Sequence, residues 1–137
     1  MVKNIVKDIN FLSQKSLDMT QEDNYIIADL KDTLLFNKRF CVGMAANMIG
    51  YLKNAIIFEN NTKTSEVLLN PKIVKSDGKY EIEEGCLSLE GKRKTVRYKK
   101  IKVEYLDEFY RRRIKTFIDF EAEIIQHEID HLMGILI

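Results

Sequence analysis

Apolar residues recur at helical spacing in two parts of the chain. The first part runs from Thr20 to Asn37, where a hydroxyl and two early carboxylates suit a helix N-terminus. Its apolar stripe consists of Ile26, Ile27, Leu30 and Leu34. The second part starts at Asp119, and one of its faces contains Phe120, Ile124, His127, His131 and Leu132. The pattern therefore predicts two helices, and a weaker helical spacing in residues 1–19 has no capping residue that we can identify.

The segments between these helices have the pattern of strands. Residues 54–58 and 66–74 are short, rich in Ile, Val and Leu, and bounded by Asn and Lys. Residues 100–105 alternate charged and apolar side chains, and residues 114–118 can pair with them across a polar turn near Asp107. A helix, several short strands and a final helix predict an α+β fold.

Composition narrows the class of protein. A chain of 137 residues with 45% apolar and 31% charged residues predicts one folded domain over residues 1–137. With 22 Lys and Arg against 21 Asp and Glu, the formal charge of +1 gives no electrostatic reason to expect DNA or a membrane as partner. Two cysteines are too few for a disulfide scaffold, so we expect reduced thiols and a cytoplasmic location.

The two histidines of the chain both lie in the sequence Gln126-His127-Glu128-Ile129-Asp130-His131. Histidines four residues apart on a helix project to the same side, so both rings can bind one metal ion with Glu128 beside it as a general base. The alternative is an exposed helix with two unrelated histidines, because short motifs of this kind also occur by chance.

A third metal ligand is expected upstream of the histidines. The protease pattern H-E-x-x-H-x-x-G-x-x-H would require histidine at position 137, where the chain has Ile137. Cys41, Cys86 and the carboxylates are the remaining candidates. Cys86 is favoured because Gly85 allows close backbone approach, whereas Cys41 is expected to be a small buried apolar side chain. Three protein ligands would leave a fourth position open, as catalytic sites require.

Three segments resemble the motifs of the peptide deformylases. Glu84-Gly85-Cys86-Leu87-Ser88 and Gln126–Leu132 resemble the second and third motifs, and residues 43–50 resemble the first motif, G-L-A-A-x-Q-x-G. The segments occur in the family order, and the resemblance spans roughly residues 20–137. It implies short antiparallel or mixed β-sheets packed around a C-terminal metal-binding helix.

The resemblance also implies a function and roles for individual residues. The family hydrolyses the N-formyl group from the formylmethionine of newly made polypeptides and releases formate. Cys86, His127 and His131 become the ligands of one divalent metal ion, Fe(II) in most members, with Zn(II) or Ni(II) able to replace it. Glu128 becomes the general base, and the backbone amide of Leu87 becomes a donor to the oxyanion.

The first motif is implied to bind the substrate, through Val42, Gly43, Met44 and position 48. Val42 and Met44 could equally pack in the core, because a pocket for methionine needs the same residue types. This chain has Met48 where the family has glutamine, and a thioether cannot donate a hydrogen bond.

Two other functions remain open at this point. Met48 is also consistent with a deformylase-like paralogue of low activity or with another N-acyl substrate. A metal-stabilised binding module is the second alternative, in which the basic residues 92–94, 97, 99–100 and 111–113 contact the ribosome. We favour solvated strand edges for these cations, because no aromatic residues alternate with them as in nucleic-acid surfaces.

Overall fold

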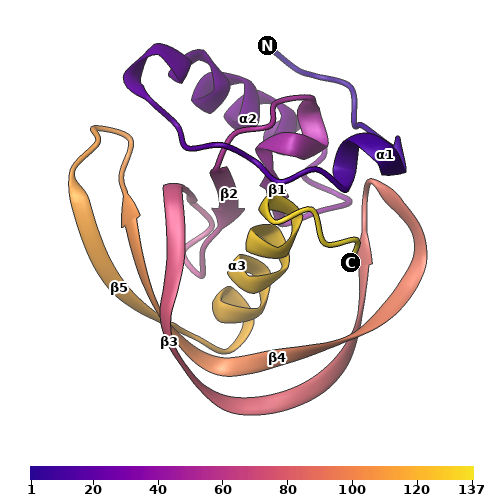
Figure 1. Ribbon diagram of the computed structural model, residues 1–137, viewed down its shortest axis with the longest axis vertical. Helices are drawn as coiled ribbons and strands as arrows, with labels where there is room; N and C mark the ends of the chain where they lie inside the picture. Colours follow the sequence, from indigo (N-terminus) through magenta and orange to yellow (C-terminus); the bar gives the residue numbers. More distant parts are fainter.

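One antiparallel sheet of five strands, in the order β1-β2-β3-β4-β5, forms the frame of the molecule (Figure 1). The computed structural model describes residues 1–137. Its helices are α1 (Ile9–Leu12), α2 (Tyr25–Phe36) and α3 (Asp119–Leu132), with short 3₁₀ turns η1 (Gln21–Asp23) and η2 (Ala46–Ile49). Its strands are β1 (Gly43–Ala45), β2 (Ala55–Glu59), β3 (Ser65–Cys86), β4 (Leu89–Leu106) and β5 (Arg112–Ile118).

Helix α2 forms where the apolar stripe predicted it. The Asp23 carboxylate accepts hydrogen bonds from the backbone N–H and the hydroxyl of Thr20, which fixes the turn η1 ahead of the helix. All four residues of the stripe are buried. The helix ends where the Asn37 side-chain amide donates to the carbonyl of Thr33 at 2.8 Å. This helix prediction is confirmed, and only its first turn is of a different type.

Strands β3 and β4 are far longer than the sequence pattern predicted. They pair from Leu69 opposite Leu106 to Cys86 opposite Leu89, with register shifts along the way. Residues 75–95 are rich in charged side chains and mostly exposed, so they do not give the alternation of a half-buried strand. Backbone pairing therefore extends β3 and β4 through residues whose hydrophobic pattern does not predict a strand.

Helix α3 lies inside the arc of β3 and β4, and it contacts β1, β2, β4 and β5 (Figure 1). Its buried side packs against a core to which Phe58 and Phe117 contribute, with ring centroids 5.9 Å apart in an edge-to-face arrangement. The predicted pairing of residues 100–105 with 114–118 is confirmed, since Lys100 lies opposite Ile118 and Tyr105 opposite Arg113. The α+β class with a C-terminal helix is confirmed.

The N-terminal segment corrects one expectation. Residues 1–19 contain the short helix α1, and it does have a cap, because the Asp8 carboxylate accepts from the backbone N–H of Asn10 at 2.9 Å. No helix in the molecule combines the length and apolar content that crossing a bilayer requires.

Replacing Phe117 with alanine should lower the free energy of unfolding by about 3–5 kcal/mol, because a fully buried ring and its contact with Phe58 are lost. The matched control is Phe109→Ala, which removes a ring that is 76% exposed and should change the stability by less than about 0.5 kcal/mol. Urea denaturation at one fixed metal concentration measures both. Equal effects of the two substitutions would contradict this description of the core.

Candidate active site

The end of β3 and the middle of α3 bring three predicted residues together. His127 and His131 lie one turn apart on α3, and their Nε2 atoms are 3.2 Å apart. The Sγ atom of Cys86, the last residue of β3, lies 3.2 Å from Nε2 of His131. The ligand atoms of Cys86, His127 and His131 all lie within 4.8 Å of one another. No other set of three such residues is grouped in this way.

The geometry and chemistry of this group fit a metal ion. Tetrahedral coordination with bonds of about 2.0–2.3 Å places neighbouring ligand atoms about 3.3–3.8 Å apart. The two 3.2 Å separations are close to this range. A thiolate and two imidazoles are the ligands preferred by zinc, iron and related divalent transition metals. The three residues could therefore hold one such ion.

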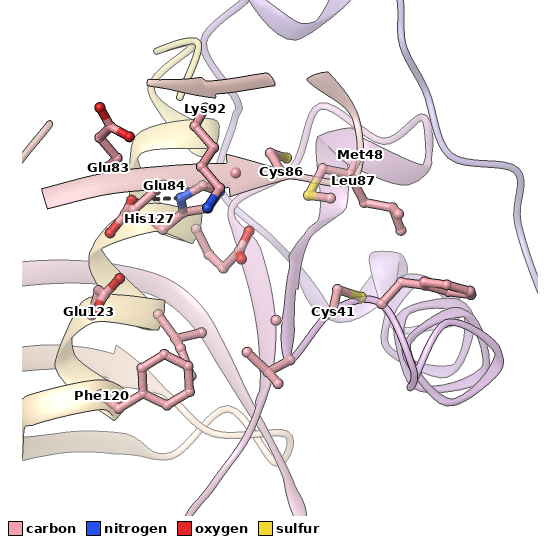
Figure 2. Close-up of a pocket in the computed structure, with 16 residues that line it drawn as sticks. Cys41, Met48, Glu83, Glu84, Cys86, Leu87, Lys92, Phe120, Glu123 and His127 are labelled. Atoms are coloured by element: carbon pink, nitrogen blue, oxygen red, sulfur yellow. Dashed lines mark hydrogen bonds and ion pairs between the residues drawn. The ribbon is translucent and has the colours of Figure 1, made fainter. Parts of the chain in front are cut away.

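Glu84 holds His127 in place, and the buried guanidinium of Arg97 in turn holds Glu84. Nδ1 of His127 lies 2.9 Å from Oε1 of Glu84, as the dashed line in Figure 2 marks. Arg97 donates to both oxygens of Glu84, at 2.7 Å from its NH2 group and 3.0 Å from Nε. The NH1 group of Arg97 donates to Asp130 at 2.7 Å. When the ring is neutral with its one proton on Nδ1 facing Glu84, the lone pair of Nε2 is directed at Cys86 and His131.

The charges of this network follow from its contacts. Burial opposes ionisation of Glu84, but hydrogen bonds from His127 and Arg97 lower its pKa to about 2. Burial also lowers the pKa of His127, but contacts with Cys86 and Glu84 outweigh it and raise the pKa to about 10. For His131, burial and the neighbouring His127 lower the pKa to about 3. The surroundings of His127 thus favour a positive charge at this point, as a cation site requires.

Glu128 lies next to the three residues and has a free oxygen. The residue is 5% exposed and lines the pocket, and its Oε1 has no hydrogen-bond partner. Burial raises its pKa to about 7, and the charge of Glu84 adds to the shift while His127 opposes it. A carboxyl group with a pKa near neutrality can both accept and return a proton.

A pocket of about 540 Å³ opens onto this group. Its apolar wall consists of Phe40, Val42, Leu87, Phe120 and Ile124. The charged side chains at its border include Glu83, Lys92 and Glu123 (Figure 2). An apolar cavity with polar groups at one end suits a small or extended ligand with one apolar side chain.

Some residues of the first motif line the pocket, and one is buried in the core. Val42, Gly43 and Met48 line the pocket, whereas Met44 is fully buried in the core and does not line it. Successive side chains of a strand point to opposite faces, so Gly43 and Met44 of β1 cannot both face the cavity. Met48 lies in η2 with its sulfur 3.4 Å from the backbone nitrogen of Ala45, which donates to it.

Cys41 also lines the pocket but does not belong to the ligand group. Burial, with the nearby charges of Glu128 and Cys86, raises its pKa to about 11. The thiol is therefore neutral near pH 7, and it contacts the carbonyl of Asn37 at 3.7 Å. It is partly exposed, so the expectation of a buried apolar side chain describes it only in part.

Arg97 is a site residue that the sequence reasoning placed wrongly. The sequence pattern predicts a solvated cation on a strand edge, yet the Arg97 side chain is only 4% exposed and it joins β3, β4 and α3. The sequence contains one signal for this burial. Alternate residues of a strand face the same side, so the buried Tyr105, Val103 and Ile101 lie on the same face as positions 99 and 97. The charged Lys99 between them hid this alternation.

The fold and this group of residues define a class: an α+β protein in which a His-Glu-x-x-His helix and an upstream cysteine can hold a catalytic metal. The polypeptide deformylase family model matches residues 2–137. A peptide deformylase of Clostridium beijerinckii is 50% identical over 137 residues, covering 100% of both chains.

Solved structures agree with this result. A peptide deformylase from Legionella pneumophila superposes with a TM-score of 0.88 at 33% identity, covering 99% of this chain and 83% of that one. A class I type b peptide deformylase from Acinetobacter baumannii, with Met-Ala-Ser bound, gives 0.86 at 27% identity and covers 99% and 96%.

The chain belongs to the polypeptide deformylase family. It is a hydrolase of protein biosynthesis that removes the N-formyl group from nascent polypeptides, and its family uses one metal ion.

Replacing Gly43 with alanine should disturb Glu128. An added Cβ would lie 2.6 Å from Cγ2 of Ile124 and 3.0 Å from Oε2 of Glu128, so the carboxylate must move. We expect deformylation to slow by at least about 10-fold, because small displacements of reacting groups have large effects on rate. Formate release measures this, and the melting midpoint monitors the clash with Ile124. The control is Gly85→Ala, whose Cβ would meet nothing closer than 3.7 Å and should leave the melting midpoint unchanged. Unchanged activity in Gly43→Ala would contradict the close contact.

Proposed function

We propose that this chain is an active deformylase of formylmethionyl polypeptides in which Cys86, His127 and His131 bind the metal ion and Glu128 is the general base. The observation that supports this most directly is the convergence of the three ligand atoms beside a buried carboxyl group with a free oxygen. Three protein ligands leave a coordination position open, which argues against a purely structural metal and against the binding-module alternative.

We assign Fe(II) as the native ion, with Zn(II) and Ni(II) able to occupy the same ligands. The mixed sulfur and nitrogen ligands suit all three ions. When bound, the ion supplies the Lewis acidity that makes water a usable nucleophile near neutral pH. Glu84 and Arg97 keep His127 oriented toward it, in the manner of the outer partners that commonly orient histidine ligands.

Glu128 moves the proton in this mechanism. Its free Oε1 accepts a proton from the attacking water as the water oxygen bonds to the formyl carbon. When the carbon–nitrogen bond breaks, Glu128 delivers that proton to the departing amine. The products are formate and a free amino terminus, and Glu128 returns to its starting state.

Substrate binding is assigned to the pocket beside β1. Val42, Gly43 and Met48 line it, and Met44 stabilises β1 from the core side. A volume of about 540 Å³ is sufficient for a methionine side chain and part of the following peptide. The Acinetobacter baumannii relative was solved with Met-Ala-Ser bound, which supports a methionyl peptide as the kind of ligand that we assign to this pocket. The backbone N–H of Leu87 is assigned as a donor to the formyl oxygen.

The proposed place of action is the cytoplasm, where formylated chains emerge from the ribosome. Contact with the ribosome itself has little support from the arginine cluster at 111–113. These three arginines pair with Asp107 and Glu104 at 3.0–3.1 Å, so their charge is largely neutralised locally. The partner that we propose is the formylated polypeptide.

The first test is formate release from formyl-Met-Ala-Ser. The protein is prepared without oxygen and loaded separately with Fe(II), Ni(II) or Zn(II). We expect one ion per chain in each case and the highest rate with Fe(II). No release despite full loading would instead favour a paralogue that acts on another N-acyl group, and acetyl and propionyl peptides would then be assayed.

Replacing Glu128 with glutamine should lower the rate by about 100-fold or more, because general-base catalysis contributes about 10²–10⁴. The metal content should remain at one ion per chain, since Glu128 is not assigned as a ligand. Glu22→Gln, an exposed substitution on η1, is the control and should leave both quantities unchanged. Full activity in Glu128→Gln would disprove the assigned base.

A further inference from the structure

Hydrolysis of a formamide places negative charge on the formyl oxygen, and donors directed at that oxygen contribute much of the rate. This inference rests on the proposed function, which supplies one protein donor, the backbone N–H of Leu87. Sites of this kind commonly use more than one donor, and the second donor must come from a side chain in or beside the pocket.

Four nearby side chains do not qualify as this donor. Met48 has no donor, and its sulfur accepts from Ala45. The amide of Asn47 donates to the carbonyl of His131 at 2.8 Å, away from the pocket. All three nitrogens of Arg97 are occupied by Glu84, Asp130 and the carbonyl of Val96. The thiol of Cys41 is a weak donor that contacts the carbonyl of Asn37.

Apart from the proposed ligand His127, Lys92 is the remaining residue of the pocket lining whose side chain is a strong donor, and it lies beside a glycine. It lies on β4 directly opposite Gly85, the residue before Cys86. A Cβ built on Gly85 would be 3.9 Å from Cγ of Lys92, so the lysine stem passes over the space that a side chain would fill. Figure 2 shows Lys92 reaching across the end of β3 toward His127, and the residue lines the pocket.

Lys92 is also free to act on a ligand. It is exposed, and no carboxylate lies within ion-pair distance of its ammonium group, unlike the paired lysines at positions 31, 53, 63 and 115. An ammonium group has three donors and a full charge, so it can stabilise an oxyanion at least as strongly as a neutral amide.

We propose that Lys92 is the second oxyanion donor of this enzyme, and that its ammonium group replaces the side-chain amide that Met48 lacks. Lys92 is thus a catalytic residue of the deformylation reaction. Its stabilisation acts on the transition state more than on the neutral formyl group of the bound substrate, so its loss lowers kcat more than it raises KM.

The test compares Lys92→Met with Lys94→Met. Methionine keeps the length of the stem and removes the charge, and Lys94 lies on the same strand but does not line the pocket. We expect Lys92→Met to lower kcat by about 100-fold with KM within about twofold, in line with the loss of one oxyanion donor. Lys94→Met should match the parent chain, and metal content and melting midpoint should be equal in all three proteins. An unchanged kcat in Lys92→Met, or a rise in KM alone, would overturn the proposal.

A glutamine introduced at position 48 should supply a second donor and make Lys92 dispensable. In a Met48→Gln background, Lys92→Met should cost no more than about 10-fold, since non-additivity is expected of two groups that act on one atom. A loss of about 100-fold in both backgrounds would overturn the claim that Lys92 replaces the amide.

A binding measurement keeps this proposal separate from the proposed function. The probe is a methionyl peptide with a tetrahedral, anionic H-phosphonyl group in place of the formyl group, titrated by calorimetry into the Zn(II)-loaded protein. Lys92→Met should weaken this probe by at least about 10-fold while leaving the affinity for Met-Ala-Ser unchanged. Equal affinity of the parent chain and Lys92→Met for the probe would overturn the proposal, whether or not formate is released. Failure of the proposed function would appear differently, as absence of formate release from the parent chain.

Discussion

The buried guanidinium of Arg97 joins the parts of the molecule that make the site. It sits between Glu84 of β3 and Asp130 of α3, and Glu84 in turn holds His127. Removing one partner from such a network leaves an uncompensated charge in the interior, which typically costs about 3–5 kcal/mol. The same contacts therefore fix the helix inside the β3–β4 arc and set the direction in which the histidine lone pair points. Structural stability and metal-site geometry depend on one set of hydrogen bonds.

This constraint explains what the sequence could and could not predict. The spacing of His127 and His131 follows from helical geometry, so a metal-binding face was predictable from two residues. Cys86 followed from the motif around it. The interrupted alternation of β4 is the one sequence signal for Arg97, because its burial depends on Glu84 and Asp130, which lie 13 and 33 positions away in the chain. The full length of β3 and β4 was hidden for a related reason, since a ribbon with charge on both faces has no apolar period.

The pocket shows how a missing group can be compensated at a distance in sequence. Met48 is accommodated in η2 by a contact with the backbone of Ala45, so the substitution does not disturb the local fold. The adjacent Asn47 is held by α3 and supports the backbone at His131. The position opposite Gly85 is open to a long side chain, and Lys92 occupies it without forming an ion pair with any carboxylate. The motif alone implies that position 48 in η2 supplies a donor to the pocket. In this chain we assign that donor to Lys92 on β4 instead.

The three residues that could hold the metal ion come from two elements that meet only in the folded chain, because Cys86 and His131 are separated by 45 positions. An unfolded chain cannot present this set of ligands, so the affinity for the ion includes the free energy of bringing β3 and α3 together. By mass action, each tenfold rise in free metal above the dissociation constant adds about 1.4 kcal/mol to the stability of the folded state. By the same relation, the concentration of free metal changes the fraction of molecules that are folded as well as the fraction that carry the ion.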